Sequence, residues 1–285
     1  MTGLRFGLVG CGRIGATADD RVNSWAVADL WLPYSHASAI TATEGAELVA
    51  VCDVDSAAAE AARIRHGARA SYTDLEAMLA SEDLDVLAIA TRARHRGEII
   101  RTAIRHGIRG LYCEKPLTNS LEDADELVSA VERAGVAFVY GTKRRFMPVY
   151  RRVRDRIAAG ELGQATNIII RFGYGTLLWS LPHAVDIAQF LAGDAAAETI
   201  QADLSLVRED VNAAIVDCDP GLNMASIRFS NGIRAILVPG YGMDVQVAGP
   251  LGLVSIEADG ANVRWRRALS DGSDIGWLLE ERVDP

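Results

Sequence analysis

Residues Leu4 to Gly15, Leu-Arg-Phe-Gly-Leu-Val-Gly-Cys-Gly-Arg-Ile-Gly, decide the fold of this chain. Leu4–Val9 predicts a short buried strand, and the pattern G-x-G-x-x-G follows it without a break. Gly10 permits a tight turn, Gly12 lets a pyrophosphate approach the backbone, and Gly15 lets a helix pack closely on the strand. Phosphates would then bind the N–H groups at the positive end of that helix. A glycine-rich turn without a ligand has the same pattern, so the motif alone leaves both interpretations open.

The composition indicates a globular protein of two domains. Of the 285 residues, 49% are apolar and 24% are charged, which is typical of a soluble chain with a full core. The net charge of −9 argues against nucleic acid as the main partner. No run approaches the roughly 18 apolar residues of a membrane span, so we expect no membrane partner.

The N-terminus and the cysteines predict a cytoplasmic location. A strand begins almost at once, which leaves no room for a signal peptide. The cysteines show no C-x-x-C spacing, so we expect buried thiols in a reducing compartment and no metal site. The four cysteines are Cys11, Cys52, Cys113 and Cys218.

A second strand, Glu47–Cys52, is followed by an acidic residue, Asp53. A carboxylate at this position accepts hydrogen bonds from the ribose hydroxyls of an adenosine, which favours NAD over NADP. Val54 stands where an arginine would suit a 2′-phosphate. The alternative is that Asp53 caps the helix predicted for Ser56–His66.

The segment Thr17–Ser35 predicts an insertion in the first crossover, after which a helix resumes near His36. The segment begins with polar residues and contains Trp25, Trp31 and Tyr34. Loops at this end of a doubly wound sheet border the ligand crevice. The insertion therefore either helps to close the substrate site or forms a surface or subunit-contact excursion.

Strands and helices then alternate as far as Tyr140. Strands are expected over 85–90, 110–113 and 136–140, with helices over 96–106 and 120–134. Thr73, followed three residues later by Glu76, predicts a capping box at a further helix. This alternation predicts an α/β fold with a parallel, doubly wound sheet.

The second half predicts an antiparallel sheet. A helix is expected over 148–160 and another over 181–191. Alternating or apolar runs occur at 164–172, 198–207, 223–230, 233–238, 244–248, 252–258 and 261–266. Asn231-Gly232, between two of these runs, is a hairpin turn signal.

Several motifs occur in the order of a known family: the glycine motif, Asp53, Thr91 to His95, Glu114-Lys115-Pro116 and Lys143 to Pro148. Together they resemble the glucose–fructose oxidoreductase / inositol dehydrogenase family, also called Gfo/Idh/MocA. The likeness covers 1–160 well and the remainder loosely. It implies an NAD-binding Rossmann domain over 1–142 and a substrate-binding and oligomerisation domain over 143–285. The second domain would carry an open, mainly antiparallel sheet that supports a homodimer or homotetramer.

The resemblance also implies the site residues. Lys115 would reach between nicotinamide and substrate and stabilise alkoxide charge. His183, in the pattern H-x-x-D, would exchange the proton, and Asp186 would hold its helix or its imidazole. The implied cofactor contacts are Gly10, Gly12, Arg13, Ile14, Gly15, Asp53, Val54, Thr91, Arg92, His95, Glu114, Lys115 and Arg144. The implied substrate contacts are Lys115, Trp179, His183 and Asp186.

Trp179 departs from the family pattern. It lies four residues before His183, where sugar and cyclitol dehydrogenases of this group commonly carry an aspartate. An indole donates one hydrogen bond and accepts no proton. Either Lys115 and His183 carry the proton transfer alone, or the substrate differs from an ordinary polyol; Trp179 would also suit stacking on a sugar ring. Tyr174 and Tyr241 are expected to pack in the core or sheet rather than line a pocket.

The sequence thus favours an NAD(H)-dependent oxidoreductase acting on a secondary alcohol or ketone of a sugar, cyclitol or related small molecule. Two alternatives remain open. One is a redox-neutral epimerase or lyase that retains tightly bound NAD. The other is a non-catalytic NAD-binding regulatory protein.

Overall fold

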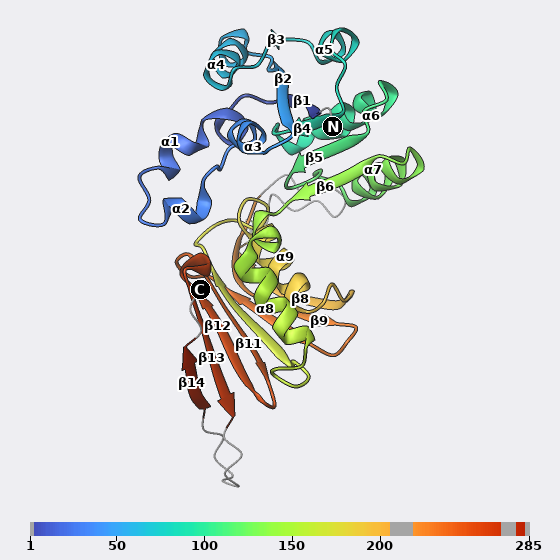
Figure 1. Ribbon diagram of the computed structural model, residues 1–285. Coiled ribbons are helices and arrows are strands. Elements are labelled where there is room, and N and C mark those ends of the chain that lie inside the picture. The colour runs from blue at the N-terminus through green and yellow to red at the C-terminus, as the bar shows by residue number, and fades with distance from the viewer. Residues whose placement is uncertain (1–2, 206–218, 269–277, 283–285) are drawn as a thin grey trace. The chain divides into compact units, whose positions relative to one another are not determined.

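The computed structural model describes residues 3–205, 219–268 and 278–282. The chain divides into two compact units, Met1–Gly141 and Thr142–Pro285 (Figure 1). Cys218 and the last two residues of the predicted run 198–207 lie outside the described residues. Among the described residues, no helix has both the length and the apolar character that crossing a membrane requires.

The first unit contains a six-stranded sheet of order β3-β2-β1-β4-β5-β6. Every pairing in it is parallel. The strands are β1 (Leu4–Val9), β2 (Ala46–Cys52), β3 (Ala70–Tyr72), β4 (Val86–Ile89), β5 (Gly110–Glu114) and β6 (Ala137–Gly141). This is the Rossmann order, in which the direction of strand addition reverses between β1 and β4. The predicted doubly wound parallel sheet is confirmed.

Helices cover both faces of this sheet and create two separate cores (Figure 1). One face packs against α3 and α4, through small residues such as Ala37 and Ala59. The other face packs against α5, α6 and α7, through larger residues such as Met78, Ile100 and Leu127. The helices are η1 (Arg13–Thr17, a π-helix), α1 (Ala18–Val22), α2 (Ala28–Trp31), α3 (His36–Ala42), α4 (Ser56–His66), α5 (Leu75–Ser81), α6 (Ala93–Arg105) and α7 (Leu121–Arg133).

The residues that cap α4 and α5 differ from those that the sequence offered. The cap of α5 is Asp74, whose carboxylate accepts a 2.7 Å hydrogen bond from the Ala77 N–H, so the capping box predicted at Thr73 is wrong by one residue. The carboxylate competes better than the hydroxyl for this role because it is charged and lies at the helix start. The short strand β3 was also not expected. The cap of α4 is Asp55, which leaves Asp53 outside the helix.

The segment Thr17–Ser35 contains α1 and α2, and α3 begins at His36 as predicted. The rings of Trp25, Trp31 and Tyr34 form a cluster with centroid separations of 5.7–6.2 Å. These mutual aromatic contacts give the segment a small apolar centre of its own.

The second unit contains an eight-stranded sheet of order β14-β13-β12-β11-β7-β10-β9-β8. Only the pairing of β7 with β10 is parallel, and the others are antiparallel. The strands are β7 (Asn167–Phe172), β8 (Ala197–Ser205), β9 (Gly221–Phe229), β10 (Arg234–Val238), β11 (Met243–Gly249), β12 (Gly252–Glu257), β13 (Asn262–Ala268) and β14 (Leu278–Arg282). The expected open, mainly antiparallel sheet is confirmed, although β14 was not predicted.

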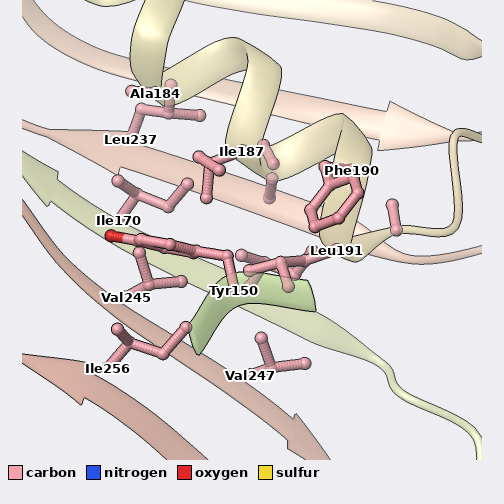
Figure 2. Packing of buried hydrophobic residues seen from close by; sticks show 14 of the residues in the cluster. Tyr150, Ile170, Ala184, Ile187, Phe190, Leu191, Leu237, Val245, Val247 and Ile256 are labelled. Carbon is pink, nitrogen blue, oxygen red and sulfur yellow. The ribbon is translucent and has the colours of Figure 1, made fainter. Parts of the chain in front are cut away.

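Two helices, α8 (Pro148–Ala158) and α9 (Leu181–Leu191), pack on one face of this sheet. Figure 2 shows Tyr150 lying between α9 and the strand side chains, among residues such as Ile170, Val245 and Leu191. The described part of the unit also contains two short 3₁₀ helices, η2 (Lys143–Phe146) and η4 (Ala258–Gly260). The strands β9 and β10 meet at the predicted turn, where Gly232 has a φ of +88°.

Candidate functional site

The glycine turn after β1 has the geometry that a dinucleotide needs. Gly10 has a φ of +94°, and a Cβ atom there would lie 2.9 Å from the Ala90 carbonyl carbon. A Cβ on Gly15 would collide with the Gly10 carbonyl oxygen. Gly12, in contrast, is exposed, and a Cβ there would meet no protein atom within 4 Å. Gly10 and Gly15 are therefore required by the fold, while Gly12 leaves open space in front of the helix.

Asp53 lies at the edge of this turn. Its Oδ2 accepts a 2.7 Å hydrogen bond from the Cys11 N–H, and its Oδ1 accepts one of 3.0 Å from the Asp55 N–H. Each carboxylate oxygen has lone pairs left for a further donor. Because Asp55 caps α4, the alternative role of Asp53 as a helix cap is wrong. The side chain of Val54 beside it is 93% exposed.

The turn after β4 faces the same switch point. It leads into α6, and the hydroxyl of Thr91 is buried with no hydrogen-bond partner among the described residues. A buried hydroxyl of this kind suits a polar ligand atom, because leaving it unpaired costs free energy. Arg92 and His95 are exposed, and the His95 Nε2 accepts a 2.9 Å hydrogen bond from Arg94. Arg13 is exposed and Ile14 is half-buried in the glycine turn.

The Glu114-Lys115-Pro116 turn follows β5. Glu114 is mostly buried, and its Oε1 lies 3.2 Å from Nε2 of His36. Burial raises the pKa of Glu114, but the His36 contact and the nearby Lys115 and Arg96 lower it, and the net pKa lies below the ordinary value. Lys115 itself is half-buried. The turn therefore holds an ionised carboxylate beside the lysine near neutral pH.

Arg96 clamps the two turns together. Its guanidinium donates to the carbonyl oxygens of Thr91 and Pro116, and the residue is 4% exposed. Burial lowers the pKa of Arg96, opposed by Cys113, Glu114 and Tyr140.

In the second unit, His183 lies in the first turn of α9, and its ring packs edge-on against Phe172 at 6.0 Å. Asp186, one turn further on, accepts a 2.7 Å hydrogen bond from Nε of Arg145. Burial raises the pKa of Asp186, and Arg145 opposes that rise. Of the two predicted roles, the hydrogen bond from Arg145 favours Asp186 holding the helix, since Arg145 belongs to η2.

Arg144 is enclosed in the second unit. It is 6% exposed and forms a bidentate pair with Asp259, at 2.6 and 2.9 Å. Its guanidinium lies 5.1 Å from the centroid of the Phe172 ring. This arrangement ties η2 to η4, and a contact with the cofactor stays a prediction.

Among the described aromatic side chains of the second unit, Trp179, Tyr174 and Tyr241 are strongly exposed, at 58%, 73% and 88%. The two tyrosine rings meet edge to face at 5.0 Å. The expectation that Tyr174 and Tyr241 pack in the core or sheet is therefore wrong. Both tyrosines lie in glycine-flanked loops just after the ends of β7 and β10. Their side chains are therefore outside the in-and-out alternation of the strands.

Sequence reasoning missed two residues that organise these sites: His36 and Arg96. His36 marked only the restart of a helix, and a buried arginine has no local pattern that separates it from a surface one. Across the described ranges, no three His, Cys, Asp or Glu side chains gather in a way that suits a metal ion.

Comparison with known proteins agrees with this geometry. Residues 4–142 match the oxidoreductase family GFO_IDH_MocA, NAD-binding Rossmann fold. D-apiose dehydrogenase of Paraburkholderia graminis is 30% identical over 207 residues, which cover 66% of this chain and 55% of that protein. Inositol 2-dehydrogenase of Rhizobium meliloti is 27% identical over 274 residues, covering 89% of this chain and 76% of the relative.

A solved structure shares the whole fold. Levoglucosan dehydrogenase, in complex with NADH and L-sorbose, matches with a TM-score of 0.74 and 21% identity, covering 100% of this chain and 81% of its own. The glycine turn after β1 and the parallel sheet of the first unit are those of a dinucleotide-binding fold. Residues 4–142, nearly all of the first unit, belong to the Gfo/Idh/MocA oxidoreductase family as its NAD-binding Rossmann domain.

Proposed function

We propose that this protein is an NAD(H)-dependent oxidoreductase that transfers a hydride between nicotinamide and a secondary alcohol or ketone of a sugar or cyclitol. The observation that carries the cofactor choice is the Asp53 carboxylate, which is fixed against the glycine turn by the Cys11 N–H. The substrate class is supported by the relatives, whose names are those of apiose and inositol dehydrogenases.

The cofactor would be held by residues of the first unit. The open space in front of Gly12 suits the pyrophosphate, Asp53 suits the ribose hydroxyls, and the buried Thr91 hydroxyl suits a polar atom of the dinucleotide. When bound, NAD supplies the hydride chemistry, and the protein supplies orientation and proton handling. The remaining contacts proposed are Arg13, Ile14, Val54, Arg92, His95, Glu114 and Arg144.

Lys115 would donate a hydrogen bond to the substrate oxygen and stabilise the charge that develops there. The ionised Glu114 next to it favours the ammonium form that this role requires. His183 would take or give the proton of the hydroxyl, and Asp186 would fix the helix that carries it. Trp179, which is exposed, would contact the face of a sugar ring rather than a proton.

The second unit would bind substrate and form a homo-oligomer through its sheet. Helices cover one face, and the other carries apolar side chains that stay exposed, such as Ile236 at 37% and Met224 at 44%. A cytoplasmic location is proposed on the cysteines, because Cys11, Cys52 and Cys113 are buried free thiols.

The test is a panel of sugars and cyclitols assayed with NAD⁺ and with NADP⁺, using the wild-type protein and Lys115→Met. We expect reduced nicotinamide to form with at least one polyol, with NAD⁺ preferred and activity lost in Lys115→Met. Denaturing the purified protein and weighing any released nucleotide gives the second readout. Tightly retained NAD(H) without net turnover of any substrate would instead favour a redox-neutral reaction.

A further inference from the structure

We propose that the pair His36–Glu114 positions Lys115, and that the segment Thr17–Ser35 holds His36 in place for this purpose. Both are positioning residues, because they act on the substrate only through Lys115. The inference rests on the proposed function in that it gives Lys115 a chemical role. It assigns a use to a segment that is otherwise an unexplained excursion from the first crossover.

The segment is closed on itself by Asp19. The Asp19 carboxylate accepts hydrogen bonds from the Tyr34 N–H at 2.8 Å, the Ser35 N–H at 3.1 Å and the Ser38 hydroxyl at 3.0 Å. Asp19 is 7% exposed and Ser35 is fully buried. Ser35 in turn caps α3, since its side chain accepts from the Ser38 N–H. The start of α3, and therefore His36, is thus fixed by a carboxylate from the far end of the segment.

His36 connects the start of α3 to the turn that contains Lys115. It is the first residue of α3 and is 3% exposed. Its ring stacks on Tyr112 with a centroid separation of 4.5 Å, and its Nε2 lies 3.2 Å from Glu114 Oε1. The other ring nitrogen is buried with no hydrogen-bond partner among the described residues. The geometry thus suits the tautomer that carries its proton on Nε2 and donates it to the carboxylate.

Side chains from two helices therefore hold the Glu114-Lys115-Pro116 turn at its two ends. His36 of α3 holds Glu114, and Arg96 of α6 donates to the Pro116 carbonyl oxygen. Lys115 lies between these two anchored residues, so its backbone has little freedom. Fixing the backbone matters because a misplacement of about 1 Å in a reacting group can cost on the order of a hundredfold in rate.

The pair also sets the charge around the lysine. The groups that act on the Glu114 carboxylate are His36, Lys115 and Arg96. Burial raises the pKa of Tyr112, Cys113 and Tyr140 to about 12, so these neighbours stay neutral near neutral pH. Glu114 is then a negative group that interacts with the Lys115 ammonium. Removing the His36 donor would raise the pKa of Glu114 and release its carboxylate from its fixed place beside Lys115, which weakens the interaction that favours the ammonium form.

The experiment measures Lys115 directly, without requiring turnover. The pH dependence of amine labelling at Lys115, read by mass spectrometry of the labelled peptide, gives the apparent pKa of its ammonium. It is measured in the wild type, His36→Leu, His36→Gln, Glu114→Gln and Asp19→Asn, each with its thermal midpoint and NADH affinity. The matched control is His106→Leu, because His106 forms a histidine–glutamate pair with Glu76 elsewhere in the same unit.

We expect His36→Leu and Glu114→Gln to lower the apparent pKa of Lys115. We expect His36→Leu, which changes no proposed cofactor contact, to leave NADH affinity within about twofold of the wild type. Where a substrate is available, kcat falls about tenfold to a hundredfold with little change in KM. His36→Gln, which keeps an N–H donor, restores most of both values. The double variant His36→Leu/Glu114→Gln shows no loss of kcat beyond that of either single variant, because the two residues act as one unit.

Several results would overturn the proposal. An unchanged Lys115 pKa in folded His36→Leu, or an equal shift in His106→Leu, removes the role of the pair. Unchanged Lys115 behaviour in Asp19→Asn removes the role of the segment. Absence of turnover in the wild type, with the Lys115 shifts as expected, contradicts the proposed function and leaves the positioning role supported.

Discussion

The N–H of Cys11, in the glycine turn, donates a 2.7 Å hydrogen bond to Oδ2 of Asp53 at the end of β2. This bond joins the predicted pyrophosphate and ribose contacts into one rigid edge. Its consequence is that the Asp53 carboxylate stays at a fixed place beside the glycine turn, where it disfavours a 2′-phosphate by charge. We therefore expect the cofactor preference of the protein to depend on this side chain.

Asp53→Ala therefore weakens NADH binding and relaxes the choice of cofactor. Loss of hydrogen bonds to a charged group costs about 1.5–3 kcal/mol, which corresponds to roughly a tenfold to hundredfold rise in the NADH Kd. Fluorescence titration with NADH and NADPH checks this. Asp53→Asn is the control, because its amide oxygen can still accept from Cys11. An unaltered ratio of the two affinities in both variants would contradict the assignment.

Gly10→Ala and Gly12→Ala form a pair with opposite expected effects. Alanine at Gly10 must adopt a φ of +94° and approach the Ala90 backbone, so we expect lost stability and a lower thermal midpoint. Alanine at Gly12 meets no protein atom within 4 Å. We expect Gly12→Ala to keep the thermal midpoint and lose NADH affinity about tenfold or more, since its methyl group occupies the ligand's space. Full NADH affinity in Gly12→Ala would place the pyrophosphate elsewhere.

Protonation of the Asp19 carboxylate is expected to lower the free energy of unfolding at acid pH. Burial raises its pKa, but hydrogen bonds from Ser35, Tyr34 and Ser38 prevail and hold it at about 2. A lowered pKa stabilises the fold above the unfolded-state value near 3.8 and loses this effect as pH falls toward 2. The contribution is up to about 2 kcal/mol.

Urea denaturation of the wild type and Asp19→Asn at neutral pH and near pH 3 measures this contribution. We expect the variant to be less stable at neutral pH and the difference between the two proteins to shrink in acid. A difference that is the same at both pH values would show that Asp19 does not titrate in this way.

The exposed pair Tyr174 and Tyr241 predicts a contact with substrate rather than with the core. Since both rings are more than half exposed, Tyr174→Ala and Tyr241→Ala should change the free energy of unfolding by less than about 1 kcal/mol. We expect each to raise KM for a ring-shaped polyol severalfold, with the phenylalanine variants close to wild type. Steady-state kinetics on the substrate found in the panel checks this. Unchanged KM in both alanine variants would exclude the contact.

The two sheets could be predicted from the sequence because their signals are local. The strand Leu4–Val9 with its glycine turn, the helices Ser56–His66 and Leu181–Leu191, and the Asn231-Gly232 hairpin all depend on neighbouring residues. The three-residue strand β3 has no such signal. Its pairing with β2 supplies the order that its own sequence lacks.

The candidate site was only partly predictable for the same reason. Motif spacing indicates Gly12, Asp53 and Lys115 as site residues. It does not reveal that His36 contacts Glu114, because 78 residues separate them and only the parallel sheet brings them together. Tyr241 was expected to be buried because an aromatic side chain near a strand is usually part of the core. Its actual exposure is set by the conformation of the loop that carries it, which has no local sequence signal.

The most direct test of the proposed chemistry follows a labelled hydride. Polyols deuterated at their secondary carbons are incubated with the protein and NAD⁺, and the nucleotide is then weighed by mass spectrometry. We expect deuterium in the reduced nicotinamide with the wild type and none with Lys115→Met, although Lys115→Met still binds NADH. Transfer at the wild-type rate in Lys115→Met, or no transfer from any sugar or cyclitol to an NAD⁺-saturated wild-type protein, would contradict it.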